Sequence, residues 1–486
     1  MFHHLKGLYL FTFVALISGC GSGKSSEIPE ANPPNIIYIL ADDLGYGDLG
    51  CYGQEKFTTP NLDRLAREGM RFTRHYAGCT VCAPSRSVLM SGLHTGHTPI
   101  RGNQEVLPEG QSPLPDSVWT VAEMLQSAGY VTGAFGKWGL GYPGSEGDPL
   151  NQGFDEFFGY NCQRYAHRYY PEYLWENDHK FYLEGNDWTR TVTYAPDVIQ
   201  ERTLDFIRQH RDTSFFAYLP VVIPHAELIV PDDEIFRSYL GQFPEEAFHG
   251  RSGADYGPDM KIPMYCSQEY PHATFASMVH RIDQYVGEIM ETLDELGIAE
   301  NTVIMFTSDN GPHQEGGADP EFFNSSGGLR GVKRDLYEGG IRVPLIVSWR
   351  GHIEGGSTSQ HISAFWDVVP TLADIAGIRP PDCDGISFLP ELTGKEQIEH
   401  DYLYWEFHEQ GGKQAMLKDG WKAIRLQVGK DPDGPMELYR LEDDPAETNN
   451  LAAGHPDLLA SFAVAMKEAR VPSKAFNFGM STLSGE

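Results

Sequence analysis

The sequence has few cysteines, few basic residues and no apolar run long enough to cross a membrane comfortably. Seven cysteines in 486 residues do not make a disulfide-stabilised scaffold, and their spacing does not reveal which of them pair. Only 37 lysines and arginines stand against 68 acidic residues, so the formal charge is −31. This excludes a general nucleic-acid-binding protein, which would carry a basic face. An anionic substrate would also be repelled unless its site is locally basic.

The apolar run near the N-terminus has the length of a signal-peptide core. Residues 8–17 (LYLFTFVALI) follow Lys6 and precede the segment ISGC, which ends at Cys20 and resembles a bacterial lipobox. We therefore expect a lipoprotein signal peptide over residues 1–19, a lipid anchor on Cys20 and a flexible tether over residues 20–34. The protein would then be exported to the bacterial periplasm or outer membrane. Ordinary secretion with cleavage near Gly19 is the alternative.

Strand-like and helix-like segments alternate over residues 35–398. Buried strands are expected at 35–45, 130–138 and 302–311, and helices at 58–69, from Asp116 or Ser117 to 128, and at 277–296. This alternation predicts an α/β catalytic domain with a large, mainly parallel sheet and helices on both faces.

The texture of the chain changes after residue 398. Short strand-like segments at 401–409, 414–427 and 436–441 are separated by Gly, Asp and Pro, and a last helix is expected over 456–470. Residues 399–486 are therefore predicted to form a smaller C-terminal α+β domain with an antiparallel sheet.

Acidic and amide side chains follow two of the expected strands. Asp42 and Asp43 end the first, and Asp309 and Asn310 end another. Ligands of parallel sheets bind beyond the carboxyl ends of the strands, and four hard oxygen donors suit Ca²⁺ or Mg²⁺. Either pair alone would be explained by turn formation and helix capping.

The segment CAPSR at 82–86 places a cysteine at the expected start of a helix. Together with Cys79, Cys82 forms a C-x-x-C followed by His94 and His97, but these histidines are too close together for the usual zinc spacing. A redox dithiol and a buried inert cysteine are further alternatives.

Basic residues near strand ends could supply an anion pocket. A helix N-terminus favours an anion, and Arg86 can hold an oxyanion through two nitrogens. Lys137 and Lys333 lie in glycine-rich segments that let the backbone approach a ligand. Each could equally be a solvated surface charge. His225, after a strand-like run and a proline, could serve as a general acid or be a structural histidine.

Several of these segments resemble one family. CAPSR is similar to the C-x-P-S-R signature of the formylglycine-dependent sulfatases, arylsulfatase-like members of the alkaline-phosphatase-like superfamily. The resemblance extends in the family's order from about residue 34 to 452, through these segments: ADDLGYGD (41–48), SVLMSGLHTGHT (87–98), GKW (136–138), SDNG (308–311), GVKRDLYEGGIRVP (331–344) and ELYRLEDDPAETNNLA (437–452). It implies a three-layer alkaline-phosphatase-like sandwich.

The resemblance also implies roles for matching residues. A maturase would oxidise Cys82 to formylglycine, whose hydrated aldehyde would attack sulfur. Calcium would be bound by this group with Asp42, Asp43, Asp309 and Asn310. The sulfate oxygens would be held by Arg86, Lys137 and Lys333, and the departing alcohol would be protonated by His225.

One departure from the family pattern concerns Gly139, which stands where the family commonly has a histidine that helps to deprotonate the second hydroxyl. The base for sulfate release is therefore open. The segments GYNCQR and YYPEYLW resemble those of enzymes acting on 4-sulfated galactose or N-acetylgalactosamine. The candidate residues for binding a sulfated carbohydrate are Arg164, His167, His313 and His408.

The leading hypothesis is a calcium-dependent sulfuric ester hydrolase that acts on sulfated glycans. One alternative keeps the fold and metal but hydrolyses phosphoesters or phosphonates. The other is a lipoprotein that binds sulfated glycans without catalysis.

Overall fold

The computed structural model describes residues 33–187, 190–250 and 265–478. The expected signal peptide, lipidated Cys20 and most of the tether lie outside the described residues. Within these ranges, no helix combines the length and the apolar character needed to cross a membrane. The six cysteines in the described part of the chain are all free thiols.

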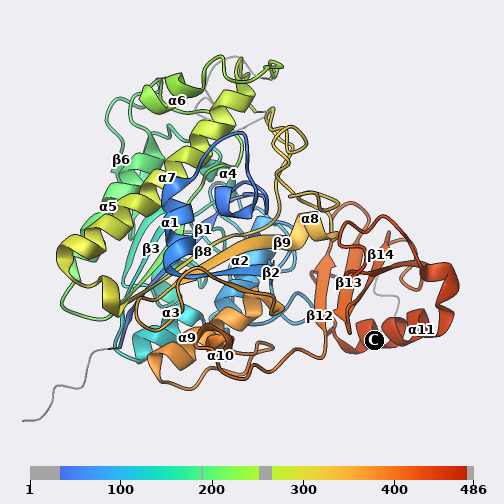
Figure 1. The fold of residues 1–486 in the computed structure, drawn as a ribbon. Coiled ribbons are helices and arrows are strands. Elements are labelled where there is room, and N and C mark those ends of the chain that lie inside the picture. The colour runs from blue at the N-terminus through green and yellow to red at the C-terminus, as the bar shows by residue number, and fades with distance from the viewer. Residues whose placement is uncertain (1–32, 188–189, 251–264, 479–486) are drawn as a thin grey trace, which may run out of the picture. The chain divides into compact units, whose positions relative to one another are not determined.

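An eleven-stranded sheet forms the centre of the fold (Figure 1). Five neighbouring strands, β8, β1, β7, β3 and β4, run parallel to one another. Strand β9 runs antiparallel to its neighbours β8 and β2, and β5 runs antiparallel to β4 and β6. The prediction of a large, mainly parallel sheet is confirmed. In spatial order the strands are β10 (Ser357–Ser359), β2 (Met70–Tyr76), β9 (Arg342–Ser348), β8 (Thr302–Ser308), β1 (Asn35–Ala41), β7 (Phe215–Pro220), β3 (Val131–Lys137), β4 (Glu156–Tyr160), β5 (Tyr173–Glu176) and β6 (His179–Tyr182), with β11 (Ser363–Ala364) beside β2.

Strand β1 is buried on both faces because helices cover both sides of the sheet. Its alternate residues Ile36, Tyr38 and Leu40 pack into one apolar layer, and Ile37 and Ile39 pack into the other. Figure 1 shows α5 and α7 on one side and α3 and α9 on the other. A continuous apolar strand is what a central parallel strand requires. The helices are α1 (Pro60–Glu68), α2 (Cys82–Ser91), α3 (Val121–Ser127), α4 (Gln163–Ala166), α5 (Ala195–Gln209), α6 (Glu234–Tyr239), α7 (Pro271–Leu296), α8 (Glu338–Ile341), α9 (Val368–Ala376), α10 (Leu389–Leu392) and α11 (Pro456–Glu468).

Two predicted helix starts were wrong. Helix α3 is capped by Thr120 rather than by Asp116 or Ser117, because the Thr120 hydroxyl accepts from the Glu123 N–H while the Glu123 carboxylate accepts from the Thr120 N–H. Helix α7 begins at Pro271, six residues before the expected start, because proline at the first position loses no helical hydrogen bond.

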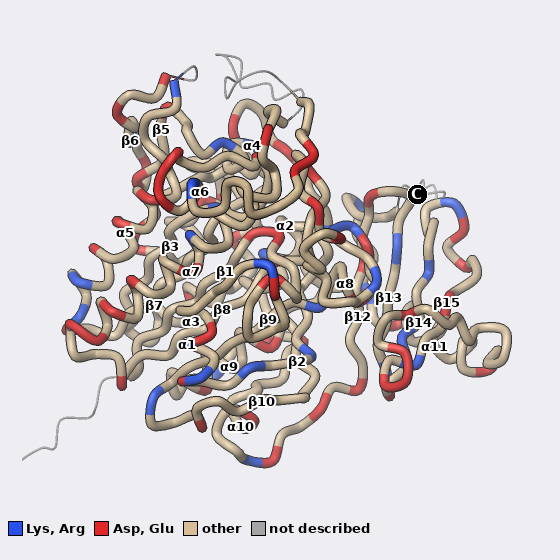
Figure 2. The backbone as a smooth tube through the Cα atoms, turned by 45° about the horizontal axis from the view of Figure 1, so that its top comes forward, with Lys and Arg blue, Asp and Glu red and all other residues tan. Residues whose placement is uncertain are grey.

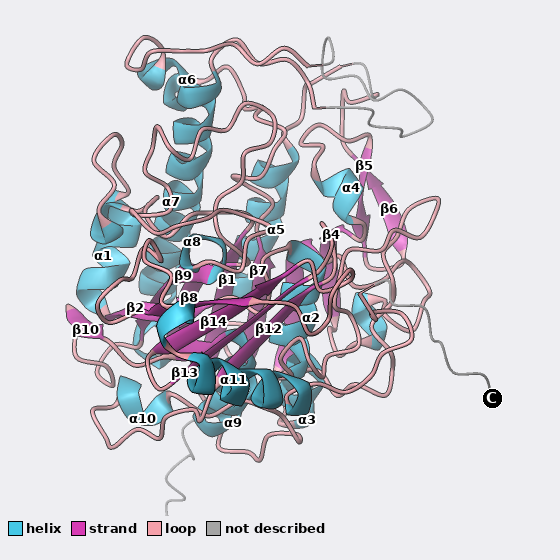
Figure 3. Ribbon diagram, turned by 90° about the vertical axis from the view of Figure 1, so that its right-hand side faces the viewer, coloured by secondary structure: helices cyan, strands magenta, loops and turns pink. Residues whose placement is uncertain are grey.

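The C-terminal segment forms the predicted antiparallel sheet. Its strands follow chain order, and α11 packs on it through Phe462 and Met466 (Figure 3). The indole N–H of Trp405 donates to the Ala77 carbonyl, which attaches this sheet to the loop before α2. The proposed boundary at residue 398 stays a prediction. The strands are β12 (Leu403–Phe407), β13 (Lys413–Lys418), β14 (Trp421–Leu426) and β15 (Met436–Arg440).

The parallel strands bring four segments that are distant in sequence to one edge of the sheet. Ala41 at the end of β1 pairs with Ser308 at the end of β8, and β7 lies between β1 and β3. The residues that follow these ends are therefore neighbours. Acidic positions spread over the outer elements (Figure 2), whereas the cations at this edge, including Lys137, are buried.

Candidate active site

Three carboxylates converge beyond β1 and β8. Asp42 and Asp43 leave β1, and Asp43 has a positive φ of 64°, a turn conformation that aspartate tolerates better than most residues. The Asp43 N–H donates to Asp309 Oδ1 over 3.1 Å, and Asn310 Nδ2 donates to Asp43 Oδ1 over 2.6 Å. All four side chains are buried.

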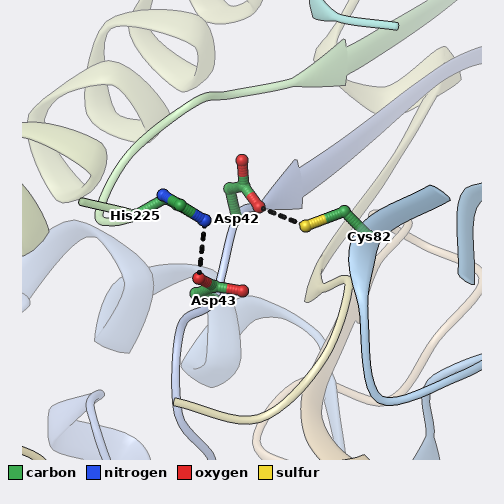
Figure 4. A group of neighbouring side chains, drawn as sticks. All are labelled: Asp42, Asp43, Cys82 and His225. Atoms are coloured by element: carbon green, nitrogen blue, oxygen red, sulfur yellow. Dashed lines mark hydrogen bonds and ion pairs between the residues drawn. The ribbon is translucent and has the colours of Figure 1, made fainter. Parts of the chain in front are cut away.

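Cys82 is the first residue of α2 and faces this cluster. Its Sγ lies 3.3 Å from Asp42 Oδ1 (Figure 4). Ser85 Oγ donates to the backbone carbonyl of Asp309 over 2.6 Å, which ties the first turn of α2 to the end of β8. Burial and the charge of Asp42 raise the pKa of the Cys82 thiol well above its ordinary value. The unmodified cysteine is therefore a thiol and not a reactive thiolate.

Each of the three predicted anion-binding cations pairs with one carboxylate. Arg86 donates to Asp309 Oδ2 through Nη2 (2.8 Å) and Nε (3.2 Å). Lys137 Nζ lies 2.6 Å from Asp42 Oδ2, and Lys333 Nζ lies 2.8 Å from Asp43 Oδ2. Burial opposes the charge on Asp42, but Lys137 and the other nearby cations hold its pKa well below the ordinary value.

His225 is also in the cluster and is in its neutral form. Its Nδ1 donates to the Ala226 carbonyl, so its Nε2 accepts from Lys333 Nζ at 2.8 Å. Burial, followed by the charge of Lys333, lowers the pKa of His225 well below its ordinary value. Its Nε2 also lies 3.2 Å from Asp43 Oδ2.

Two further histidines stack on His225. The His167 ring lies 4.2 Å from it with an interplanar angle of 15°, and the His313 ring lies 5.4 Å away at 16°. His313 contacts the Pro224 carbonyl and Glu315. The structure thus brings both of these predicted substrate-binding histidines to the site.

The residues at the strand ends fit a hard divalent cation. Burial and the negative charge of Asp42 raise the pKa of Asp309 to about 7, so the carboxylates repel one another where no cation neutralises them. Asn310 Oδ1 is buried and has no hydrogen-bond partner among the described residues. Three carboxylates and an unpaired amide oxygen are a donor set that Ca²⁺ accepts.

Other predicted residues have partners elsewhere. Arg164 contacts the Pro108 carbonyl and Glu105, and His408 Nε2 contacts Glu406 at 2.9 Å. Their roles in substrate binding stay predictions.

The cysteines and the histidines of the zinc alternative have different surroundings. Cys79 Sγ donates to the Glu406 carbonyl, and Cys82 faces Asp42. His94 Nε2 and His97 Nδ1 both lie near Asp384, at 3.7 and 2.9 Å, and these three residues offer ligand atoms within 4.8 Å of one another without either cysteine.

Two residues near the site were not identified from the sequence. Glu315 pairs with His313 and Arg334, and Lys333 and His313 hold its pKa below the ordinary value against the effect of burial. Gln163 packs against Gly139. The position of Glu315, five residues after Asn310, is a signal that could have pointed to it.

Comparisons with known proteins agree with this geometry. The family model for sulfatases matches residues 34–378, and the model for the C-terminal part of N-sulphoglucosamine sulphohydrolase matches residues 331–469. Human arylsulfatase A is 32% identical to this chain, covering 91% of this chain and 88% of its own length. The chain belongs to the sulfatase family.

A bacterial relative and a solved structure are also similar to this sulfatase. N-acetylgalactosamine-6-O-sulfatase of Bacteroides thetaiotaomicron is 29% identical over 95% of this chain and 98% of its own length. A solved structure described as Ps i-CgsB in complex with k-i-k-neocarrahexaose has a TM-score of 0.72 at 25% identity, covering 90% of this chain and 92% of that one. The sulfatase is thus a sulfuric ester hydrolase of the alkaline-phosphatase-like superfamily.

We predict that Ca²⁺ stabilises the protein through the carboxylate cluster. Millimolar Ca²⁺ should raise the melting temperature of wild-type protein, and a chelator should reverse the rise; occupancy at 100 times Kd corresponds to about 2.7 kcal/mol. Asn310→Leu should lose most of the rise, because the unpaired oxygen is removed. Asn310→Asp should keep it while melting earlier without metal, because a fourth carboxylate is buried. Differential scanning fluorimetry measures both; a wild-type Tm unaffected by Ca²⁺ would contradict the prediction.

Proposed function

We propose that this sulfatase removes sulfate from sulfated galactose or N-acetylgalactosamine units of glycans, using Ca²⁺ and a formylglycine made from Cys82 by a maturase. The observation that carries the proposal is the position of Cys82. Its side chain points at Asp42 within a buried cluster that also holds Arg86, Lys137 and Lys333.

The charge balance of the cluster supports an anionic substrate. The three carboxylates are matched by three cations, so the two positive charges of a bound Ca²⁺ would be left to attract a sulfate ester. With Ca²⁺ bound, the site would be locally positive and would attract an anionic substrate to a chain of formal charge −31.

The chemistry divides between the modified residue, the metal and the cations. Formylglycine would supply an oxygen nucleophile at residue 82, and Ca²⁺ would act as a Lewis acid on oxygen. Arg86, Lys137 and Lys333 would donate to the sulfate oxygens. In a dry site these donors stabilise the charge that develops in the transition state.

Lys333 and His225 are positioned to protonate the departing alcohol oxygen. Lys333 carries the proton and donates it to His225 Nε2 in the ligand-free geometry. Lys333 could therefore deliver the proton to the substrate oxygen directly, or His225 could deliver it from Nε2 after taking it from Lys333.

The relatives' names support an amino sugar or galactose unit as the substrate and raise one question about its sulfate. The sequence suggested a 4-sulfate, whereas the bacterial relative is named for the 6-position. We further propose that the protein is a lipoprotein anchored through Cys20 in the bacterial periplasm or outer membrane.

Sulfate release tests the proposed activity. Protein co-expressed with a maturase should release sulfate from 4-sulfated or 6-sulfated galactose or N-acetylgalactosamine, and Cys82→Ala should abolish release while folding normally. Ion chromatography measures the product, and peptide mass verifies formylglycine. Phosphate released from a phosphoester, with no sulfate from any ester, would instead support the phosphoester alternative; binding without turnover would support the non-catalytic one.

The effect of replacing His225 on kcat/KM should depend on the leaving group of the substrate. His225→Ala should lower kcat/KM on a sugar sulfate by about 10²–10⁴-fold, the range for general acid catalysis. The loss on 4-nitrophenyl sulfate should be much smaller, because nitrophenolate departs without a proton. Equal losses on both substrates would show that His225 acts by another route, and His97→Ala serves as the control for an unrelated histidine.

Replacement of Cys20 should release the protein from the membrane. Wild-type protein expressed in a bacterial host should sediment with membranes, and Cys20→Ser should remain in the supernatant, because no acyl chain can be attached. Ultracentrifugation and immunoblotting measure the partition. Wild-type protein found only in the soluble fraction would rule out the anchor.

A further inference from the structure

Gly139 lies two residues after Lys137 and leaves a space that another side chain fills. Its φ is +76°, and a Cβ built on it would lie 3.0 Å from Gln163 Cγ and 3.1 Å from Gln163 Nε2. The Gly139 N–H donates to the Asn161 carbonyl, which holds the two segments together. The carboxamide of Gln163 therefore occupies the place that a side chain at residue 139 would take.

Helix α4 turns the face carrying Gln163 toward the reacting groups. Gln163 is the first residue of α4 and His167 is its C-cap, so the two lie one turn apart on the same face. The His167 ring stacks on His225 at 4.2 Å. Burial, followed by the charges of His225, Lys137 and Lys333, lowers the pKa of His167.

The Gln163 amide is buried and lacks an acceptor. Only 6% of the residue is exposed, and its Nε2 has no hydrogen-bond partner among the residues that the structure describes. The acceptor Asn161 Oδ1, two residues earlier, is also buried and has no hydrogen-bond partner among the described residues. Leaving a buried donor unpaired is unfavourable, so the Gln163 amide is available to donate to a ligand or to a water that a ligand displaces.

A sulfate ester can supply an acceptor for this amide. The cations Lys137, Arg86 and Lys333 are donors, so a sulfate ester held by them would bring further acceptor oxygens into the site. A sulfate ester has three non-bridging oxygens and a single negative charge. A neutral amide donor adds a hydrogen bond to it without adding another cation.

We propose that Gln163 contacts the substrate and that its Nε2 donates a hydrogen bond to a non-bridging sulfate oxygen beside Lys137. This inference rests on the sulfatase activity proposed above. It assigns the space opened by Gly139 to a neutral donor that comes from a different segment of the chain.

Gln163→Met separates substrate binding from packing. Methionine keeps the length of the side chain but cannot donate. The Tm of the ligand-free variant should equal or exceed that of wild type, because an unpaired buried donor is removed. Its kcat/KM on N-acetylgalactosamine 6-sulfate and on 4-nitrophenyl sulfate should fall about 10- to 100-fold, as expected for a hydrogen bond to a charged group. Inorganic sulfate should raise its Tm less than that of wild type.

Gln200→Met is the matched control. Gln200 is equally buried, at 7% exposed, but its Nε2 already donates to the Tyr285 carbonyl and to Glu288. This variant should melt earlier than wild type and keep its kcat/KM and its response to sulfate.

Gln163→Glu gives a second measurement if the methionine variant does not fold. Its carboxylate keeps the shape but repels sulfate, so the Tm rise caused by inorganic sulfate should disappear. The proposal is overturned if Gln163→Met melts earlier and keeps kcat/KM within twofold, or if either variant responds to inorganic sulfate as wild type does. The sulfate-induced Tm shift needs no turnover, so it decides the role of Gln163 even if wild type hydrolyses no ester.

Discussion

The site depends on one electrostatic constraint: three carboxylates buried at adjacent strand ends must be neutralised. Asp42, Asp43 and Asp309 each meet a buried cation from another segment of the chain. Removing one partner would leave an uncompensated buried charge, which typically costs about 3–5 kcal/mol. The pairing therefore fixes the three cations at the strand ends, and a bound divalent cation would relieve the repulsion that remains at Asp309.

The C-terminal sheet contacts a segment that contributes to the same site. Lys422 on β14 lies fully buried, 2.9 Å from Glu338 and 3.0 Å from Glu447. Glu338 begins α8, five residues after Lys333, so this ionic triad holds the segment that carries Lys333. Burial, together with the charge of Glu338 and opposed by Lys422, raises the pKa of Glu447 to about 7. The small sheet is thus connected to the site through the segment between Lys333 and Glu338.

Much of this arrangement could be predicted from the sequence because it follows from strand ends. The buried run of β1 and the acids after it indicated both the parallel sheet and the cluster of oxygen donors at its edge. The position of Cys82 at a helix start was also readable. The start of α3 was not, because a capping box at Thr120 outcompeted two earlier capping residues. The contacts of Arg164 and His408 depend on loops whose paths the sequence does not specify.

The histidine stack and Gln163 show why the remaining parts of the site need the structure. His167, His225 and His313 come from three separate segments, and their rings form one stack only in the fold. In the sequence, Gly139 stands where the family commonly has a histidine, so a side chain is missing there. In the fold Gly139 leaves room for Gln163, so the space of a missing side chain in one segment is filled by a side chain from another. A motif comparison along the chain detects the loss and cannot detect the replacement, since the two residues are neighbours only in space.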